Sequence, residues 1–141
     1  DPANPASVPE STLRDWHGQH GVEWWGRRED MPAVLQGAHI ACLPSFYGEG
    51  LPKTLLEAAA CGLPIVTTDA PGCREVVRDG VNGLLVPVRN AAVLAAALGT
   101  LIGDAAQRRR MGEQSRMRAE KEFGLESVIA QTLAVYREVC A

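Results

Sequence analysis

The fold is decided by residues 39–86, HIACLPSFYGEGLPKTLLEAAACGLPIVTTDAPGCREVVRDGVNGLLV. Three short apolar runs in this stretch have the composition of buried strands, and helical patterns bounded by proline and glycine separate them. The expected strands are 39–43, 65–68 and 84–86, and the expected helices are 53–61 and 73–77. Strands that alternate with helices predict a parallel sheet with helices on both faces, the doubly wound, Rossmann-like α/β class.

The elements on the amino-terminal side are shorter and less regular. We expect a helix from Glu10 to about His20, a strand over 22–25 and a second helix from Asp30 to Gln36. In doubly wound sheets, ligands bind at the carboxyl ends of the strands, in the loops that lead into helices. The loops expected to hold the site are 26–29, 44–51 and 69–72.

After Asn90, a candidate helix N-cap, the chain has a helical pattern to its end. Breaks at 103–104 and at Gly124 divide this region into three helices, and Asp104 followed by Gln107 resembles a capping box. Apolar side chains recur at helical spacing in the last helix, at Leu125, Val128, Ile129, Leu133, Tyr136 and Val139. We expect this stripe to face the core or to contact a domain outside this chain.

The composition is that of an ordinary folded domain. Of the 141 residues, 46% are hydrophobic and 22% are charged, which excludes a disordered chain and provides enough core to fold without disulfides or metal. The net charge of −3 argues against nucleic acid as the main partner. No apolar stretch approaches the roughly 20 residues of a membrane-spanning helix. The spacing of the four cysteines fits neither a redox pair nor a zinc site, so free thiols in a reducing cytosol are expected.

Two acidic residues, Glu49 and Glu57, carry the most specific chemistry. Glu49 lies in a glycine-flanked loop just before a helix, where free amides and the helix dipole attract anions. On a helical wheel, Glu57 points away from Leu55 and Ala59, which should face the core. Two acids about 8–12 Å apart beside an anion site would fit the two hydroxyl-rich ends of a nucleotide sugar.

Each acid could also have a purely structural role. Glu49 could be a solvated loop acid that stabilises the helix dipole by a few tenths of a kcal/mol. Glu57 could be an exposed helix residue paired with Lys53, one helical turn earlier. Spacing alone does not decide between these roles and ligand binding.

The segment from Glu49 to Asp69 resembles the E-x7-E region of the retaining family-four glycosyltransferases, enzymes with the two-domain GT-B fold. Residues 71–77 and 79–87 resemble the segments that follow it in the same family, and the resemblance covers about residues 21–122. It implies that the chain is part of the carboxyl-terminal, donor-binding domain of such an enzyme.

The resemblance also implies roles for individual residues. The implied donor-binding residues are Glu49, Gly50, Leu51, Glu57, Gly26 and Arg27. In the family, the second Glu of the motif, here Glu57, binds the donor ribose, while the first, here Glu49, is the catalytic residue beside the donor sugar. The two residues after Glu49 meet the sugar and the distal phosphate, and the glycine–arginine pair approaches the base. Gly72 and Glu75 are expected to be structural.

The reaction implied by the resemblance is transfer of a sugar, with retention, from a nucleoside diphosphate sugar to a saccharide or lipid-linked acceptor, as in polysaccharide biosynthesis. It would take place in the cytoplasm, with the parent enzyme able to sit peripherally on the membrane. No metal cofactor is expected, because positive charge and helix amides help the diphosphate to leave. The resemblance further implies that the acceptor domain and the opening strands of the donor domain lie outside this chain. We therefore expect the chain alone to be inactive and to bind donor weakly.

Three other functions fit parts of the pattern. A nicotinamide-dinucleotide domain would use residues 48–50 as its glycine-rich turn and Asp69 on the ribose, but Lys53 occupies the place of the third glycine. A glycoside hydrolase would use Glu49 and Glu57 as acid and base, although an anion site at a helix start suits a phosphate better. A non-catalytic nucleotide-sugar-binding module is the third alternative.

Overall fold

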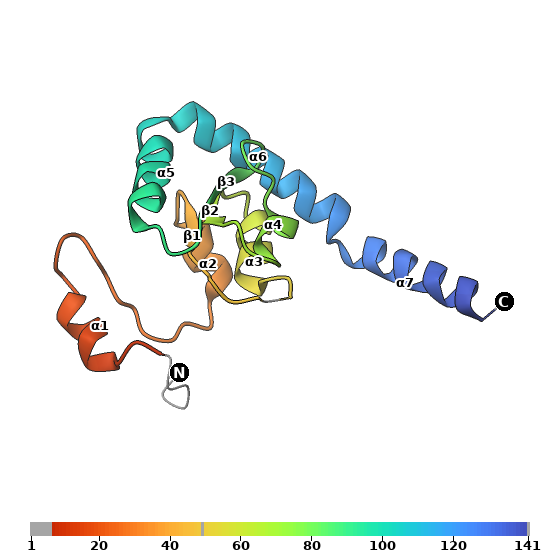
Figure 1. Cartoon of the computed structure of the whole chain (residues 1–141), viewed down its shortest axis with the longest axis horizontal. Helices are drawn as coiled ribbons and strands as arrows, with labels where there is room; N and C mark the ends of the chain where they lie inside the picture. The colour runs from red at the N-terminus through yellow and green to blue at the C-terminus, as the bar shows by residue number, and fades with distance from the viewer. Residues whose placement is uncertain (1–6, 49, 141) are drawn as a thin grey trace. The chain divides into compact units, whose positions relative to one another are not determined.

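The chain folds as two compact units, residues 1–31 and 32–141. This division comes from a computed structural model that describes residues 7–48 and 50–140. Figure 1 shows the order of the elements along the chain. The larger unit contains the sheet and most of the helices, and we describe each unit by itself.

The described part of the smaller unit contains the helix α1 (Glu10–Trp16), which confirms the first expected helix but ends before His20. An ion pair of 2.5 Å between Arg14 Nη2 and Glu10 Oε1 spans one turn of it. The chain leaves the helix through Gly18, His20 and Gly21, which all have positive φ angles. Glycine adopts this conformation at no steric cost, so a tight turn ends the helix here.

The strand expected over 22–25 is wrong: these residues, all of them described, form no strand. Their backbone groups pair instead with the end of α1, because Gly18 N donates to Val22 O at 2.8 Å and Trp24 N donates to His17 Nδ1 at 3.1 Å. Strand-forming residues favour an extended backbone, but they form a strand only where a neighbouring strand provides hydrogen-bond partners.

The larger unit is built on a parallel sheet of three strands within the described residues. The strands are β1 (Ala41–Leu43), β2 (Ile65–Thr68) and β3 (Gly83–Val86), in the order β1-β2-β3. Cys42 pairs with Val66, and Val66 pairs with Leu84. All four residues of β2 are buried, as expected for the central strand of a sheet covered on both faces.

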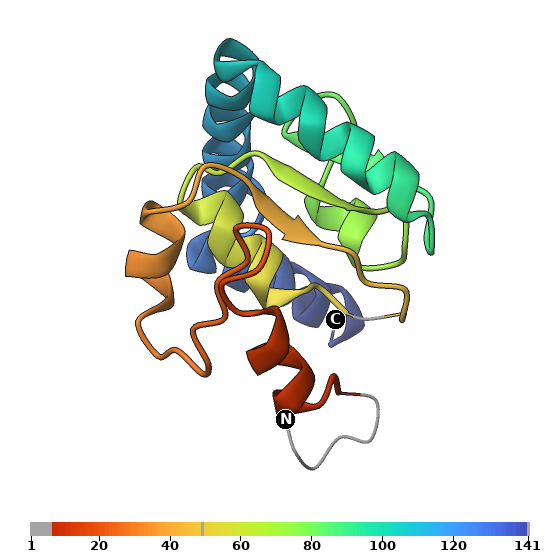
Figure 2. The ribbon, with the colours of Figure 1, turned by 90° about the vertical axis from the view of Figure 1, so that its left-hand side faces the viewer.

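Helices cover both faces of this sheet, which confirms the doubly wound class. The helices that contact it are α3 (Lys53–Ala60), α4 (Cys73–Val76), α5 (Ala91–Gly103) and α6 (Ala105–Glu122). Helix α2 (Met31–Gln36) precedes β1, and α7 (Leu125–Val139) follows α6 and contacts it. Figure 2 shows α5 on one side of the sheet and α3 on the other. The helix starts at Asn90 and Asp104 are confirmed, since their side chains accept from Val93 N and Gln107 N.

The core lies between the sheet and these helices. On the α5 side, Val66 and Val86 pack with Leu101 of α5 and Met111 of α6, all essentially buried. On the other side, α3 buries Leu55, Ala58 and Ala59. Full burial of a side chain such as Leu101 contributes about 1.5–3 kcal/mol. The apolar residues of the helices on both sides therefore pack against the sheet that lies between them.

A buried polar network joins the turn before β3 to α6. Asn82 is fully buried; its Oδ1 accepts from Arg78 N at 2.7 Å and its Nδ2 donates to Val76 O at 3.2 Å. Ser115 Oγ of α6 donates to Asn82 O at 3.0 Å. Because a buried polar group without a partner costs about 1–3 kcal/mol, this network fixes where α6 crosses the sheet.

The apolar stripe of α7 does not face the core. No residue of this helix is buried, and the side chains at its two ends, Leu125 and Val139, are 76% and 78% exposed. The core-facing interpretation is therefore wrong. Helical periodicity identifies a common face, but it does not say which surface covers that face. Contact with a domain outside this chain stays a prediction.

Candidate functional site

The carboxyl ends of the three strands lie along one edge of the sheet, because the strands are parallel. Two of the predicted site loops start at this edge: 44–51 follows β1 and 69–72 follows β2. The third predicted loop, 26–29, follows no strand, so its expected position at the end of a strand is wrong. A loop that the sequence did not single out, 87–90, leaves the edge after β3.

The loop after β1 is held by the neighbouring strand. Thr67 Oγ1 of β2 donates to Leu43 O at 2.6 Å, and Thr68 Oγ1 donates to Ser45 O. Buried hydroxyls need such partners, and here the partners are the carbonyl at the end of β1 and a carbonyl of the loop. Threonine at the end of β2 therefore positions the start of the segment that leads to α3.

Helix α3 presents Glu57 on its outer side, as predicted. Leu55 and Ala59 are buried, whereas the Glu57 side chain is 36% exposed. Its carboxylate also pairs with Lys53 Nζ at 3.4 Å, across one helical turn. The predicted orientation is therefore confirmed, and the structural alternative of a Lys53 pair is present as well. Glu57 keeps a half-exposed carboxylate able to accept hydrogen bonds from a ligand.

The residues just before α3 carry the other predicted contacts. Glu49 lies outside the described residues. Gly50 and Leu51 are exposed, and Pro52 at the N-cap position provides no side-chain hydrogen bond to the helix. Since the first amides of any α-helix lack intrahelical partners, the start of α3 has donors available for an anion. The roles of Glu49, Gly50 and Leu51 stay predictions.

Gly26 and Arg27 belong to the smaller unit, residues 1–31. Both are exposed, and Gly26 has a φ of +65° that marks a turn. In the same loop, Arg28 Nε donates to Asp30 Oδ1 at 2.7 Å, and this hydrogen bond lowers the pKa of the Asp30 carboxyl below its usual value. A contact of Gly26 and Arg27 with the base stays a prediction.

The loop after β2 is stabilised by its own side chains. Arg74 Nε pairs with Asp69 Oδ1 at 2.9 Å, and the Glu75 carboxylate accepts from Gly72 N at 2.5 Å. Gly72 has a φ of +86°, a conformation in which glycine is favoured. The structure thus supports the structural roles expected for Gly72 and Glu75.

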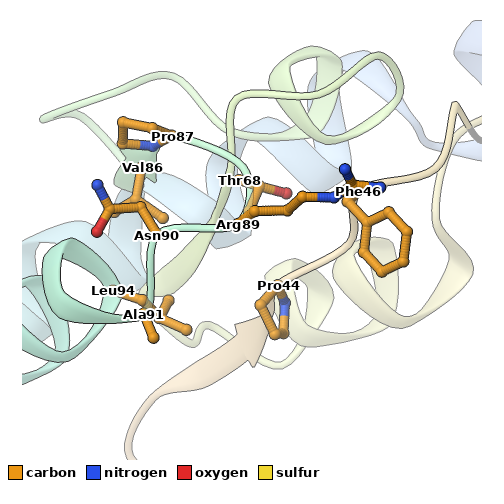
Figure 3. A pocket seen from close by; sticks show the side chains of 9 residues that line it. All are labelled: Pro44, Phe46, Thr68, Val86, Pro87, Arg89, Asn90, Ala91 and Leu94. Carbon is orange, nitrogen blue, oxygen red and sulfur yellow. The ribbon is translucent and has the colours of Figure 1, made fainter.

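A pocket opens at the same sheet edge, on the side covered by α5. It has a volume of about 340 Å³, within the usual range for small-ligand sites. It is lined by Pro44, Phe46, Thr68, Val86, Pro87, Arg89, Asn90, Ala91 and Leu94. Figure 3 shows the Arg89 side chain reaching across the pocket toward Phe46. The sequence indicates Asn90 only as a helix cap and does not indicate Arg89, because no local pattern links positions 46 and 89.

Two further kinds of site have no counterpart in the described residues. No three His, Cys, Asp or Glu side chains in residues 7–48 and 50–140 come together as a metal site requires. Within the same residues, no helix combines the length and the apolar character needed to cross a bilayer. The four cysteines, Cys42, Cys61, Cys73 and Cys140, are free thiols.

The sequence matches the family described as "Glycosyl transferases group 1" over residues 3–104. The chain belongs to the group 1 glycosyltransferases. The match includes the sheet, α3 and all of α5, and therefore both Glu57 and the residues that line the pocket. Membership of this family decides against the nicotinamide-dinucleotide and glycoside hydrolase alternatives.

Curated relatives of this glycosyltransferase chain are much longer than it is. It is 41% identical over 114 residues to MMP alpha-(1->4)-mannosyltransferase of Mycolicibacterium hassiacum, which covers 80% of the chain and 28% of the relative. It is 39% identical over 114 residues to alpha-maltose-1-phosphate synthase of Mycobacterium tuberculosis, covering 77% and 29%. The chain thus spans less than a third of the length of these enzymes.

Similar solved structures confirm the fold. HepE of Anabaena, crystallised with UDP, aligns with a TM-score of 0.75 and 28% identity over 81% of this chain and 32% of HepE. Sucrose-phosphate synthase of Thermosynechococcus elongatus aligns with a TM-score of 0.77 and 28% identity over 92% and 33%. The three-stranded sheet and its helices are therefore part of the GT-B glycosyltransferase architecture.

Proposed function

We propose that this chain is the donor-binding part of a retaining glycosyltransferase that transfers a sugar from a nucleoside diphosphate sugar to a saccharide or lipid-linked acceptor. The observation that carries the proposal is the arrangement after β1: in a member of this family, an uncapped helix start is followed by the half-exposed carboxylate of Glu57. The complex of HepE with UDP-glucose supports a donor of this class, because that protein is 26% identical and aligns over 89% of this chain.

In this proposal the two ends of the donor are held by different groups. Glu57 accepts hydrogen bonds from the ribose hydroxyls, and a carboxylate acceptor makes such bonds stronger than neutral ones. Glu49 acts beside the donor sugar, while Gly50, Leu51 and the amides at the start of α3 face the sugar and the distal phosphate. Gly26 and Arg27 approach the base.

The chemical step needs stabilisation of the departing nucleoside diphosphate. Charge develops on its distal phosphate as the bond to the sugar breaks, and preorganised amides at a helix start stabilise such charge without reorganising. We propose that the reaction needs no metal ion. In a transfer assay of a longer protein that contains this chain, an excess of a chelator should leave the rate unchanged.

We propose further that the chain works as part of a longer, cytoplasmic enzyme. Relatives of which the match covers only 28% and 29% support the first part, and four free thiols support a reducing compartment. The 141-residue chain alone should neither transfer sugar nor bind donor tightly, because the acceptor site and the remaining donor contacts would come from elsewhere in that enzyme.

Nucleotide titration tests the donor proposal directly. Amide resonances of the isotope-labelled 141-residue chain should shift around α3 when UDP or another nucleoside diphosphate is added, and NAD at the same concentration should not shift them. A panel of nucleotide sugars then identifies the base and the sugar. The donor proposal fails if no nucleoside diphosphate perturbs α3, and the expectation of an inactive chain fails if the chain alone transfers sugar at a measurable rate.

A further inference from the structure

The pocket between the sheet edge and the start of α5 has a charged lip and apolar walls. The Arg89 guanidinium lies over the Phe46 ring, 5.0 Å from its centroid. Figure 3 shows the Arg89 side chain extending toward Phe46, with Pro44 below them and Leu94 near Ala91 at the other end of the pocket. A cation held over an aromatic face is oriented by the attraction of the ring. The guanidinium is therefore directed across the opening of the pocket.

Arg89 differs from several other arginines of the larger unit in having no anionic partner. Arg74 pairs with Asp69, Arg78 with Glu122, and Arg116 with Glu120. Among residues 7–48 and 50–140, no carboxylate pairs with Arg89 and no carbonyl accepts from it. Its five N–H donors are thus available, in the planar arrangement that suits phosphate or carboxylate oxygens.

The backbone at Arg89 is held in an unusual conformation by the helix that follows. Arg89 has a φ of +57°, which L-residues other than Asn and Asp rarely adopt. The next residue, Asn90, is the N-cap of α5: its Oδ1 accepts from Val93 N and its O accepts from Leu94 N, both at 3.1 Å. The cap fixes the chain on one side and β3 fixes it on the other. Strain of this kind concentrates at functional positions, which favours a functional role for the side chain.

The remaining lining determines what kind of molecule fits beside the anion. The walls include Pro44, Val86, Pro87 and Leu94, so most of the ligand must be uncharged and must have C–H groups that can pack against them. Ligand sites commonly combine such walls with a few polar groups that set orientation. Besides Arg89, Asn90 can contribute its Nδ2 donor, which has no partner among the described residues. A sugar ring that carries one acidic substituent has this combination.

We propose that this pocket binds a sugar through an anionic substituent, a phosphate or a carboxylate, with Arg89 holding the anion and Phe46 bordering the ring. The assignment of the sugar to the transfer reaction rests on the proposed function, because Phe46 lies in the same loop, 44–51, as the predicted donor contacts. The pocket itself lies on the α5 side of the sheet, whereas Glu57 is on α3, on the opposite side. The anionic sugar is therefore a ligand distinct from the nucleotide.

Nuclear magnetic resonance of the labelled 141-residue chain tests this proposal, with Arg Nε–H signals recorded beside the amides. The probes are glucose 1-phosphate, glucuronate, glucose and inorganic phosphate. Glucose 1-phosphate or glucuronate should shift Arg89 Nε–H and the Thr68 and Ala91 amides, and the stronger of the two identifies the anion. Glucose and inorganic phosphate should each bind at least tenfold more weakly. Equal binding of glucose, equal binding of inorganic phosphate, or no shift with either anionic sugar would overturn the proposal.

Substitutions locate the effect at the lip of the pocket. Arg89→Gln should weaken binding of the anionic sugar about tenfold or more, since a charged hydrogen-bonding group is lost. Arg109→Gln, at an exposed arginine of α6, is the matched control and should leave binding unchanged. Phe46→Ala provides a second variant that keeps the charge, and it should also weaken binding. Wild-type affinity in both pocket variants contradicts the assignment.

A UDP titration of the same samples separates this inference from the donor proposal. UDP should shift α3 equally in the wild-type chain and in Arg89→Gln. If UDP binds but no anionic sugar does, only the pocket assignment is wrong. If anionic sugars bind through Arg89 but no nucleoside diphosphate perturbs α3, only the donor proposal is wrong. Loss of UDP binding in Arg89→Gln would make Arg89 part of the nucleotide site and overturn the proposal of a separate ligand.

Discussion

Replacing Glu57 by alanine should weaken nucleotide binding while leaving the fold intact. The described partner of its carboxylate is Lys53 Nζ, 3.4 Å away, on a side chain that is 86% exposed. An exposed ion pair across one helical turn contributes about 0.3–0.5 kcal/mol, so the melting temperature should change by no more than about 3 °C. Hydrogen bonds from two ribose hydroxyls to this carboxylate would contribute about 1–3 kcal/mol, which is roughly 5- to 150-fold in Kd.

The ribose role can be isolated with a modified ligand. UDP and its 2′,3′-dideoxy analogue are titrated into the wild-type chain and into Glu57→Ala, with affinities taken from amide shifts around α3. Removing the hydroxyls should weaken binding to the wild-type chain, but it should make little further difference to the variant. The coupling free energy from this cycle reports the contact between Glu57 and the ribose.

Two control variants show whether a loss of UDP affinity is specific to the Glu57 carboxylate. Glu113→Ala removes an exposed carboxylate from α6, and it should bind UDP as the wild-type chain does. Lys53→Gln removes the partner of Glu57 but keeps its carboxylate, and it should retain most of the affinity. The ribose role of Glu57 is refuted if Glu57→Ala binds UDP with wild-type affinity. It is also refuted if the loss in that variant is the same for UDP and for the dideoxy analogue.

Three further predictions concern the fold. Gly112→Ala should destabilise the protein by about 1–3 kcal/mol in thermal unfolding, because a Cβ at this position would lie 2.2 Å from Gly62 O, where α6 meets the backbone after α3. The control is Gly99→Ala, which has open space around its Cβ and should be neutral or stabilising by up to about 1 kcal/mol. Asn82→Ala should cost about 1–3 kcal/mol in denaturant unfolding, since the replacement leaves Val76 O and Arg78 N without their partner. NMR titration should give the Asp30 carboxyl a pKa below the usual Asp value, and Arg28→Gln should return this pKa to the usual value. Because the pKa of Asp30 is lower in the folded state, the Arg28–Asp30 interaction stabilises the fold fully above the unfolded-state pKa. This stabilisation is lost as the pH falls through the folded-state pKa.

Much of the secondary structure was predictable because its signals are local. Asn90 and Asp104 cap their helices with their own side chains, and the buried residues of β2 form one continuous β-branched run, IVTT. Helix α3 begins after Pro52, whose ring favours a helix start, and ends before Gly62, which favours a helix end. Such features need no information from the rest of the chain, so their boundaries agree closely with the structure.

The wrong predictions fall where a local preference needed a distant partner. Residues 22–25 have strand-forming side chains, but their backbone hydrogen bonds go to residues at the end of α1. The apolar stripe of α7 has helical spacing, yet nothing in that spacing identifies a covering surface. In both cases the local pattern is present, but the structure that it forms depends on contacts that the sequence alone does not specify.

The candidate site also has one part that the sequence predicted and one part that it did not. The direction of Glu57 followed from the helical wheel, since Leu55 and Ala59 had to face the sheet. The pocket at the same sheet edge was not predictable, because it forms only when the loop after β1 and the turn before α5 are brought to one edge by parallel strand pairing.

By itself, then, the sequence determined the class of the fold, the helix that carries Glu57 and the resemblance to a glycosyltransferase family. These rest on periodicity, caps and a motif, all of which act over short separations along the chain. Only the tertiary structure decided that residues 22–25 are not a strand, that no residue of α7 is buried, and that Arg89 lies over Phe46 at the mouth of a pocket. Each of these outcomes depends on which segments, distant in the chain, supply hydrogen bonds and buried surface to one another.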